Sequence, residues 1–218
     1  MRKKYDGIQM QYKTVLKEAT AEMEEKKSRF IANVKPINSE EEALEFINNL
    51  KAKYWDATHN VYAYYISGES IIQRFSDDGE PSGTAGMPVL EVIKRMELQD
   101  LVVVVTRYFG GILLGAAGLV RAYSKSASLG IEAAGIITKK LCQLVNIIID
   151  YSTFGKIQNK IMNEGYTIKD TLYAQDVELS VLVPLEDVEA FIEYVNDAAN
   201  GNVLIDLGKK EYVTVKLT

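Results

Sequence analysis

The run LVVVVT, from Leu101 to Thr106, is the feature that most constrains the fold. A continuous β-branched run favours a strand, and its lack of polar alternation indicates that both of its faces are buried. Such a strand belongs in the middle of a sheet. The chain has 218 residues, of which 47% are hydrophobic, so it can bury a core in one large domain or two small ones.

The segment before this run predicts a strand followed by a capped helix. Phe30, Ala32 and Val34 alternate and share one face, which is typical of a strand. Ser39 precedes three glutamates, and apolar residues with helical spacing follow. A serine cap with a glutamate three residues later is a capping box, which predicts a helix over residues 40–53.

Further elements surround the same run. The segments THNVYAYYIS and SIIQRFS, joined by Gly68-Glu69, predict a hairpin. Apolar spacing predicts a short helix over residues 89–96, with Pro88 tolerated near its start. A second helix is predicted over about residues 113–134, with Gly115, Gly118 and Ala122 along one side.

The pattern restarts beyond residues 135–140. The predicted elements are strand, helix, strand, strand, helix and strand, over residues 141–150, 152–163, 166–174, 177–184, 185–199 and 203–217. This β-α-β-β-α-β order is that of the ferredoxin-like fold. We therefore expect an N-terminal domain over residues 1–135 and a ferredoxin-like C-terminal domain over residues 136–218.

Charge and cysteine content narrow the class of protein. The net charge is -5, with 17 basic and 18 acidic residues up to position 135 and 8 and 12 after it. This lacks the basic surplus of a general nucleic-acid binder. A single cysteine, Cys142, rules out an intramolecular disulfide, and the longest apolar stretch is too short to span a membrane. With no signal-peptide pattern at the N-terminus, a cytoplasmic protein is expected.

The segment SDDGEPSGTAGMP concentrates polar chemistry in a predicted loop. Asp77, Asp78 and Glu80 lie within four residues. Three interpretations stay open: the acids cap a turn at Gly79, they hold an ion or take part in catalysis, or they bind a partner. The spacing is not that of a calcium loop.

The same segment also suggests a backbone nest before a helix, which favours anions. Ser82 and Thr84 are placed to cap that helix or to contact a phosphate. The Gly-Lys-Ser/Thr pattern of a phosphate loop is absent, and the adjacent acids repel phosphate. A nucleotide site is therefore disfavoured.

Two arginines follow the central strand. Arg107 stands at its C-terminal end, where ligands of open α/β sheets tend to bind, and Gly110-Gly111 permits a turn. Arg121 lies on the helix beyond. Both arginines are expected to face the three acids, either as an internal network that braces two loops or as a charged recognition site.

The lone histidine has a structural and a functional interpretation. His59 begins a predicted strand, and one histidine cannot build a histidine-rich metal site. A triad with Ser82 and Asp77 or Asp78 stays formally possible. The adjacent Tyr108 and Phe109 suggest that one of them faces outward, as in base-stacking platforms.

Three segments together resemble the IMPACT family, in its bacterial YigZ-like branch: ATHNVYAY, FSDDGEPSGTAGMPVLEVI and VVVVTRYFGGILLGAAGLVRAYS. The resemblance implies an α+β protein. Its N-terminal domain would be a two-layer fold similar to the second domain of a small-subunit ribosomal protein and to domain IV of elongation factor G. Its C-terminal domain would be ferredoxin-like and similar to domain V of that factor.

The resemblance also implies a function. Eukaryotic relatives regulate translation initiation by competing for an activator of a stress-responsive initiation-factor kinase. We therefore expect a non-enzymatic regulator of translation that binds the ribosome, RNA or an associated protein, without a cofactor or metal. The alternative is a small metal-dependent hydrolase or phosphate-processing enzyme that uses Asp77, Asp78, Glu80 and His59.

The matching positions supply the candidate residues. The candidate binding residues are His59, Asp77, Asp78, Glu80, Ser82, Thr84, Arg107, Tyr108 and Arg121. The expected structural glycines are Gly79, Gly83, Gly86, Gly110, Gly111, Gly115 and Gly118. Relatives usually read LGAGGL where this chain has Ala117 in LGAAGL, and a position inside a helix would favour the alanine.

Overall fold

The computed structural model describes residues 4–5, 8–68 and 70–215, and the chain divides into two compact units. The N-terminal unit comprises residues 12–138. The C-terminal unit comprises residues 139–215 and the described residues up to 11, which include β1 (Lys4–Tyr5) and β2 (Ile8–Gln9). The expected domains instead divide at 135 and 136 and assign the first residues to the N-terminal domain.

The N-terminal unit is built on a five-stranded antiparallel sheet in the order β4-β5-β8-β6-β7. Its strands are β4 (Ala19–Glu25), β5 (Ser28–Pro36), β6 (His59–Ser67), β7 (Ile71–Ser76) and β8 (Leu101–Tyr108). β8 is the central strand and its residues from Leu101 to Arg107 are buried, which confirms the prediction from LVVVVT. The predicted hairpin is β6 and β7, and Glu69 of its turn lies outside the described residues.

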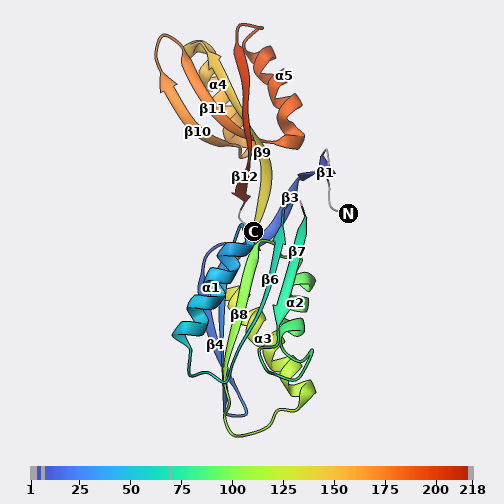
Figure 1. The fold of residues 1–218 in the computed structure, drawn as a ribbon. Coiled ribbons are helices and arrows are strands. Elements are labelled where there is room, and N and C mark those ends of the chain that lie inside the picture. Colours follow the sequence, from blue (N-terminus) through green and yellow to red (C-terminus); the bar gives the residue numbers. More distant parts are fainter. Residues whose placement is uncertain (1–3, 6–7, 69, 216–218) are drawn as a thin grey trace. The chain divides into compact units, whose positions relative to one another are not determined.

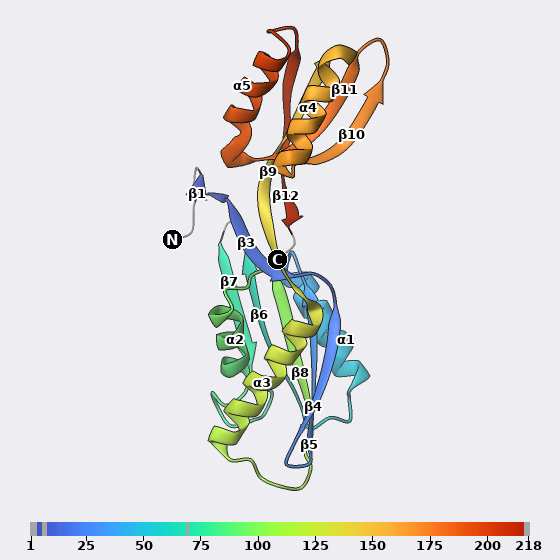
Figure 2. The same ribbon diagram turned by 180° about the vertical axis from the view of Figure 1, so that it is seen from behind.

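Helices cover both faces of this sheet, as Figures 1 and 2 show from opposite sides. α1 (Glu40–Lys53) packs on the face that carries Val102 and Val104. α2 (Gly86–Arg95) and α3 (Ala116–Ala134) pack on the face that carries Val103 and Val105. The unit therefore has three layers, not the two expected from the resemblance, because β8 is apolar on both faces and each face must be covered.

Local capping explains where the helices begin. Ser39 Oγ accepts a hydrogen bond from the Glu42 backbone N–H at 3.3 Å, and α1 has the predicted bounds. α3 begins at Ala116, later than predicted, because Gly115 has φ +71° and is outside the helix. Ala117 lies within the helix, where alanine is favourable.

The C-terminal unit has the predicted β-α-β-β-α-β order. Its elements are β9 (Ile136–Ile149, which begins in the N-terminal unit), α4 (Tyr151–Glu164), β10 (Thr167–Tyr173), β11 (Val177–Pro184), α5 (Val188–Ala198, after the short helix η1 at Leu185–Asp187) and β12 (Leu204–Val215). The sheet order is β10-β11-β9-β12, and β3 (Gln11–Val15) lies off this path. The alternating residues Val145, Ile147 and Ile149 pack against α4 and α5 in the core of this unit.

No helix within the described part of the chain is long and apolar enough to cross a membrane. Both units combine helices with an antiparallel sheet, so the chain is a mixed α and β protein.

Candidate functional site

Asp77 fills the backbone nest at the start of α2. Its Oδ2 accepts from the Gly83 N–H at 2.9 Å, and its Oδ1 accepts from Ala85 at 3.1 Å and Gly86 at 2.8 Å. The position that an external anion would take at this helix start is therefore occupied by the chain's own carboxylate. Asp77 therefore caps the start of α2.

Asp78 joins the loop to two other elements. Its Oδ1 lies 2.8 Å from Lys51 Nζ on α1, and its Oδ2 accepts from the Asn60 backbone N–H at 2.7 Å on β6. Asp78 itself has φ +46° and Gly79 has φ +89°, so the chain reverses sharply here. The lysine is a partner that the sequence pattern did not reveal, because it lies 27 residues away.

Glu80 and Arg107 form a buried ion pair. Glu80 Oε1 lies 2.6 Å from Arg107 Nη1 and also accepts a hydrogen bond from the Tyr123 hydroxyl at 2.8 Å. Burial, followed by the charge of Glu80, raises the pKa of Tyr123, so this phenol keeps its proton and stays a donor. β8, α3 and the loop before α2 therefore meet at one carboxylate oxygen.

Arg107 is also held by aromatic rings and a hydroxyl. Its guanidinium carbon lies 5.5 Å from the ring centres of both Phe30 and Phe109. Its Nη2 donates to Ser28 Oγ at 3.3 Å, and Ser28 Oγ in turn accepts from the Gly110 N–H. These contacts stabilise a charge that is only 5% exposed.

His59 has a defined tautomer. It pairs with Arg107 in the sheet, and its Nδ1 lies 2.8 Å from the Asp78 backbone carbonyl. A carbonyl oxygen only accepts, so Nδ1 carries a proton in this contact. Nε2 lies 3.8 Å from Glu80 Oε1.

The remaining candidate residues lie outside this network. The Thr84 hydroxyl donates to the Pro81 carbonyl at 2.6 Å, and Ser82 is exposed. The Tyr108 hydroxyl donates to Asp56 at 2.8 Å, and burial and this bond raise its pKa.

Arg121 does not reach the acids. It is exposed on α3 and, among the described residues, makes no ion pair with Asp77, Asp78 or Glu80. The expectation that both arginines face the acidic loop is therefore wrong for this one. The helix begins at Ala116, so the face that carries Tyr123 turns inward and places position 121 toward solvent.

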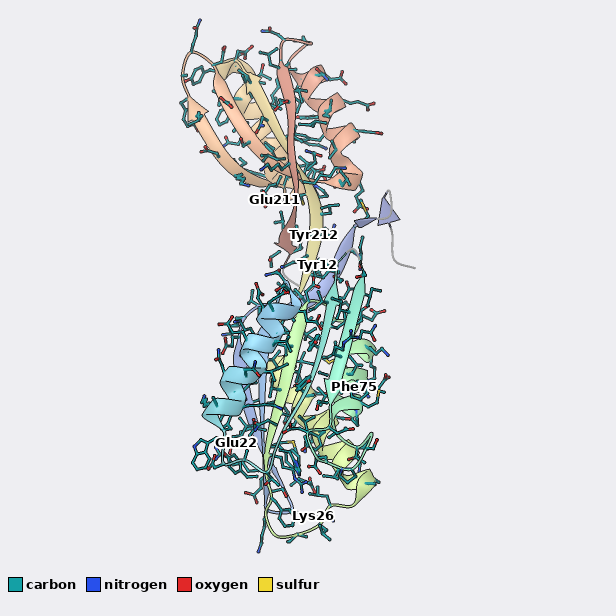
Figure 3. The ribbon with its side chains drawn as sticks, in the orientation of Figure 1. Tyr12, Glu22, Lys26, Phe75, Glu211 and Tyr212 are labelled. Atoms are coloured by element: carbon teal, nitrogen blue, oxygen red, sulfur yellow. The ribbon has the colours of Figure 1, made fainter. Side chains whose placement is uncertain are left out.

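Gly110 shows why the loop after β8 needs glycine. A Cβ on this residue would lie 2.0 Å from the backbone carbon and oxygen of Lys27, in the turn between β4 and β5. Figure 3 marks Lys26 of that turn at the end of the sheet where these loops gather. Among the other expected structural glycines, φ is positive at Gly79, Gly83, Gly111 and Gly115; Gly86 lies against the Ser76 backbone and Gly118 against Leu114.

An open groove of about 400 Å³ lies over the ion pair, and we call it the Glu80 groove. Its floor includes His59, Glu80 and Arg107, and its walls include Phe109, Leu113 and Leu114. Phe109 is 45% exposed and Leu113 is 83% exposed. The wall residues were not predicted as site residues, although the apolar ILL between glycines in FGGILLG was a usable signal.

Tyr123 lies in a segment that matches the family, but it was not predicted as a binding residue. It lies in the buried stripe of α3, a position that usually signals packing alone. Its hydroxyl was the available signal, because a buried tyrosine usually needs a hydrogen-bond partner. Within the described residues, no group of three or more histidine, cysteine, aspartate or glutamate side chains is arranged to hold a metal ion.

Comparison with known proteins identifies the family. The family described as the Impact N-terminal domain matches residues 26–131, and a domain of unknown function, DUF1949, matches residues 147–202. IMPACT family member YvyE of Bacillus subtilis (strain 168) is 43% identical over 202 residues, which cover 93% of this chain and 93% of YvyE. The chain belongs to the IMPACT family.

Further relatives of this IMPACT family member confirm the bacterial YigZ-like resemblance. IMPACT family member YigZ of Escherichia coli (strain K12) is 31% identical over 187 residues, 82% of this chain and 88% of YigZ. Protein IMPACT homolog of Dictyostelium discoideum is 40% identical over 95 residues, which are 42% of this chain and 27% of that protein. A solved structure described as the crystal structure of an hypothetical protein has a TM-score of 0.58 at 29% identity, covering 91% of this chain and 97% of that one.

The Glu80 groove lies wholly within the part of this IMPACT family member that matches the Impact N-terminal domain. Its lining runs from Thr58 to Leu119, inside the matched residues 26–131. All lining residues of the groove therefore belong to the N-terminal unit.

Proposed function

We propose that this IMPACT family member is a non-enzymatic, cytoplasmic regulator of translation. It binds the ribosome, RNA or a translation-associated protein through the loops around the Glu80 groove. One observation carries the proposal: Asp77, Asp78, Glu80 and Arg107 are engaged by contacts within the protein, while apolar side chains stand exposed at the rim. Such a site is preorganised to bind a surface.

The engagement of Asp77 and Asp78 argues against these two residues as the catalytic carboxylates of the hydrolase alternative. Asp77 accepts three backbone N–H groups, and Asp78 contacts Lys51 and the Asn60 N–H. A carboxylate that activates water needs an open oxygen beside the substrate. The carboxylates of Asp77 and Asp78 instead stabilise the start of α2 and of β6, which fits a structural role.

The topology of the units supports the same proposal. The C-terminal unit has the β-α-β-β-α-β order with sheet order β10-β11-β9-β12, which fits a ferredoxin-like fold similar to domain V of elongation factor G. For the N-terminal unit we keep the proposed likeness to domain IV of that factor, with the additional layer formed by α1. A likeness to a ribosome-binding factor is an argument by analogy, so the binding assay decides.

The test is co-sedimentation of the full chain with purified ribosomes at low and at raised salt. Wild type is compared with Leu113→Asp, which places a charge on the exposed rim, and with Leu204→Asp, a control at a 69% exposed leucine in the other unit. We expect wild type and Leu204→Asp to pellet with ribosomes and Leu113→Asp to be reduced at least fivefold. Absence of wild type from the ribosomal pellet at low salt, together with no RNA retention on a filter, would overturn the proposal.

A further inference from the structure

The floor of the Glu80 groove offers hydrogen-bond acceptors. Both hydrogen bonds that the Glu80 carboxylate accepts, from Arg107 and Tyr123, are made to Oε1. Among the described residues no hydrogen bond or ion pair is made to its Oε2, and Glu80 lines the groove, so we take Oε2 as the acceptor for a ligand. His59 Nδ1 donates to the Asp78 carbonyl, so in the ring that carries this one proton Nε2 is a second acceptor. A ligand that fits this floor must therefore bring a donor.

The charge of the floor selects a neutral donor. The negative charge of Glu80 is balanced by Arg107 at 2.6 Å. An ammonium group in the groove would meet Arg107, and a phosphate would meet Glu80 and the neighbouring acidic loop. An uncharged N–H or O–H group is repelled by neither Arg107 nor Glu80. It gains a hydrogen bond to an ionised acceptor in a partly desolvated site.

The walls select a flat apolar body. Phe109, Leu113, Leu114 and Leu119 line the groove, and its volume of about 400 Å³ is large enough for one aromatic side chain. Aromatic rings pack against other rings and against leucines over a large area. Among the groove-lining residues the only lysine or arginine is Arg107, whose Nη1 is engaged by Glu80 and whose Nε is buried without a hydrogen-bond partner in the described residues. The lining therefore offers a single buried cation, and not a basic cluster, to an RNA phosphate.

We propose that the Glu80 groove binds a tryptophan or tyrosine side chain of a protein partner. The ring packs between Phe109 and the leucines, and the indole N–H or phenol O–H donates to Glu80 Oε2 or to His59 Nε2. Tryptophan and tyrosine are the residues that most often dominate protein interfaces from such pockets. The inference deepens the proposed function, since it names the class of partner that docks at this site.

The experiment is a titration of the 15N-labelled full chain, followed by backbone amide shifts in NMR. The probes are N-acetyl-tryptophanamide, N-acetyl-tyrosinamide, N-acetyl-phenylalaninamide and guanosine monophosphate. The tyrosine and phenylalanine amides differ only in the phenol hydroxyl, so they are the matched pair for the donor. We expect the tryptophan and tyrosine amides to shift the backbone amides of Gly79, Glu80 and residues 109–115, and the phenylalanine amide to bind about tenfold more weakly because it lacks the donor.

Variants locate the binding. Leu113→Asp should weaken the tryptophan amide at least fivefold, while Leu204→Asp, exposed in the other unit, should leave it unchanged. Equal binding of the phenylalanine and tryptophan amides would overturn the role of the donor. If guanosine monophosphate binds at the same residues more tightly than the tryptophan and tyrosine amides, the proposal of a protein partner would be overturned in favour of a nucleobase. Absence of shifts at Gly79, Glu80 and residues 109–115 would overturn the groove as a site.

The result separates this inference from the proposed function. If ribosome co-sedimentation depends on Leu113 but no aromatic amide binds the groove, the translation role stands and the aromatic side chain is wrong. If the amides bind as expected but the protein never pellets with ribosomes or retains RNA, the groove inference stands and the translation role is wrong.

Discussion

Glu80 and Arg107, 27 residues apart in the chain, form a buried ion pair with 2.6 Å between Oε1 and Nη1. Both side chains are less than a tenth exposed. A buried pair stabilises a fold little compared with an apolar pair, but removal of one partner leaves an uncompensated charge. The pair therefore holds the floor of the groove in place, and loss of either partner should destabilise the fold.

The first prediction concerns this pair. Arg107→Met should lower the free energy of unfolding by about 3–5 kcal/mol, because the Glu80 carboxylate stays buried without its partner. The double variant Glu80→Met with Arg107→Met should recover most of that loss. Urea denaturation measures both. A double variant as unstable as the single one would show that the loss came from packing and not from charge.

Tyr123 gives the second prediction. Tyr123→Phe removes the hydrogen bond to ionised Glu80 and should lower the free energy of unfolding by about 2 kcal/mol. Tyr173→Phe is the matched control, since this tyrosine is 63% exposed and should change stability by less than about 0.5 kcal/mol. Equal effects of the two substitutions in urea denaturation would contradict a special role for the buried hydroxyl.

Asp77 gives the third prediction. Asp77→Ala leaves the N–H groups of Gly83, Ala85 and Gly86 without their acceptor, so it should cost about 1–2 kcal/mol of stability. Hydrogen exchange of those three amides should accelerate more than exchange in the middle of α3. Asp77→Asn keeps one acceptor oxygen, so its stability and exchange rates should fall between those of wild type and Asp77→Ala. Unchanged exchange in Asp77→Ala would count against the capping role.

The fourth prediction compares glycine-to-alanine substitutions at two positions. Gly110→Ala should destabilise strongly, by about 2 kcal/mol or more, because its Cβ would meet the Lys27 backbone at 2.0 Å. Gly155→Ala, in the exposed middle of α4 with nothing within 4 Å, should stabilise by about 0.5–1 kcal/mol. Thermal unfolding of both variants checks the pair, and a harmless Gly110→Ala would contradict the close approach.

The fifth prediction concerns alkaline pH. Burial, assisted by Asp187 and Glu164, raises the pKa of Tyr166 to about 12 from an ordinary value of 10.0. A folded pKa above the unfolded one contributes stability that is fully present below pH 10.0 and is lost as pH rises toward 12. An ultraviolet absorbance titration should show a late-ionising phenol that is absent in Tyr166→Phe. Loss of an early-ionising phenol in that variant would be the opposite result.

Much of the secondary structure was predictable because its signals are local. Ser39 and the glutamates after it predicted α1 with its observed bounds. The run at Leu101–Thr106 predicted the central strand, and the alternating and helical patterns after residue 140 predicted the order of the C-terminal elements. In each case the informative residues lie within one or two turns, or one strand, of each other.

The candidate site was predicted only in part. The sequence brought His59, Glu80 and Arg107 forward as candidates, and they do meet. It did not predict that Lys51 pairs with Asp78, nor that Arg121 points to solvent. A sequence shows which residues are charged, but it does not show which of the many oppositely charged residues each one will pair with after folding.

The sequence by itself determined the elements, their order and the family, since these depend on periodicity, capping and contiguous motifs. Only the tertiary structure decided that helices cover both faces of the sheet, that Asp77 fills its own nest, and that Tyr123 completes the contacts of Glu80. The physical reason is distance along the chain. Hydrogen bonds and ion pairs act over about 3 Å, and folding alone decides which distant residues come that close.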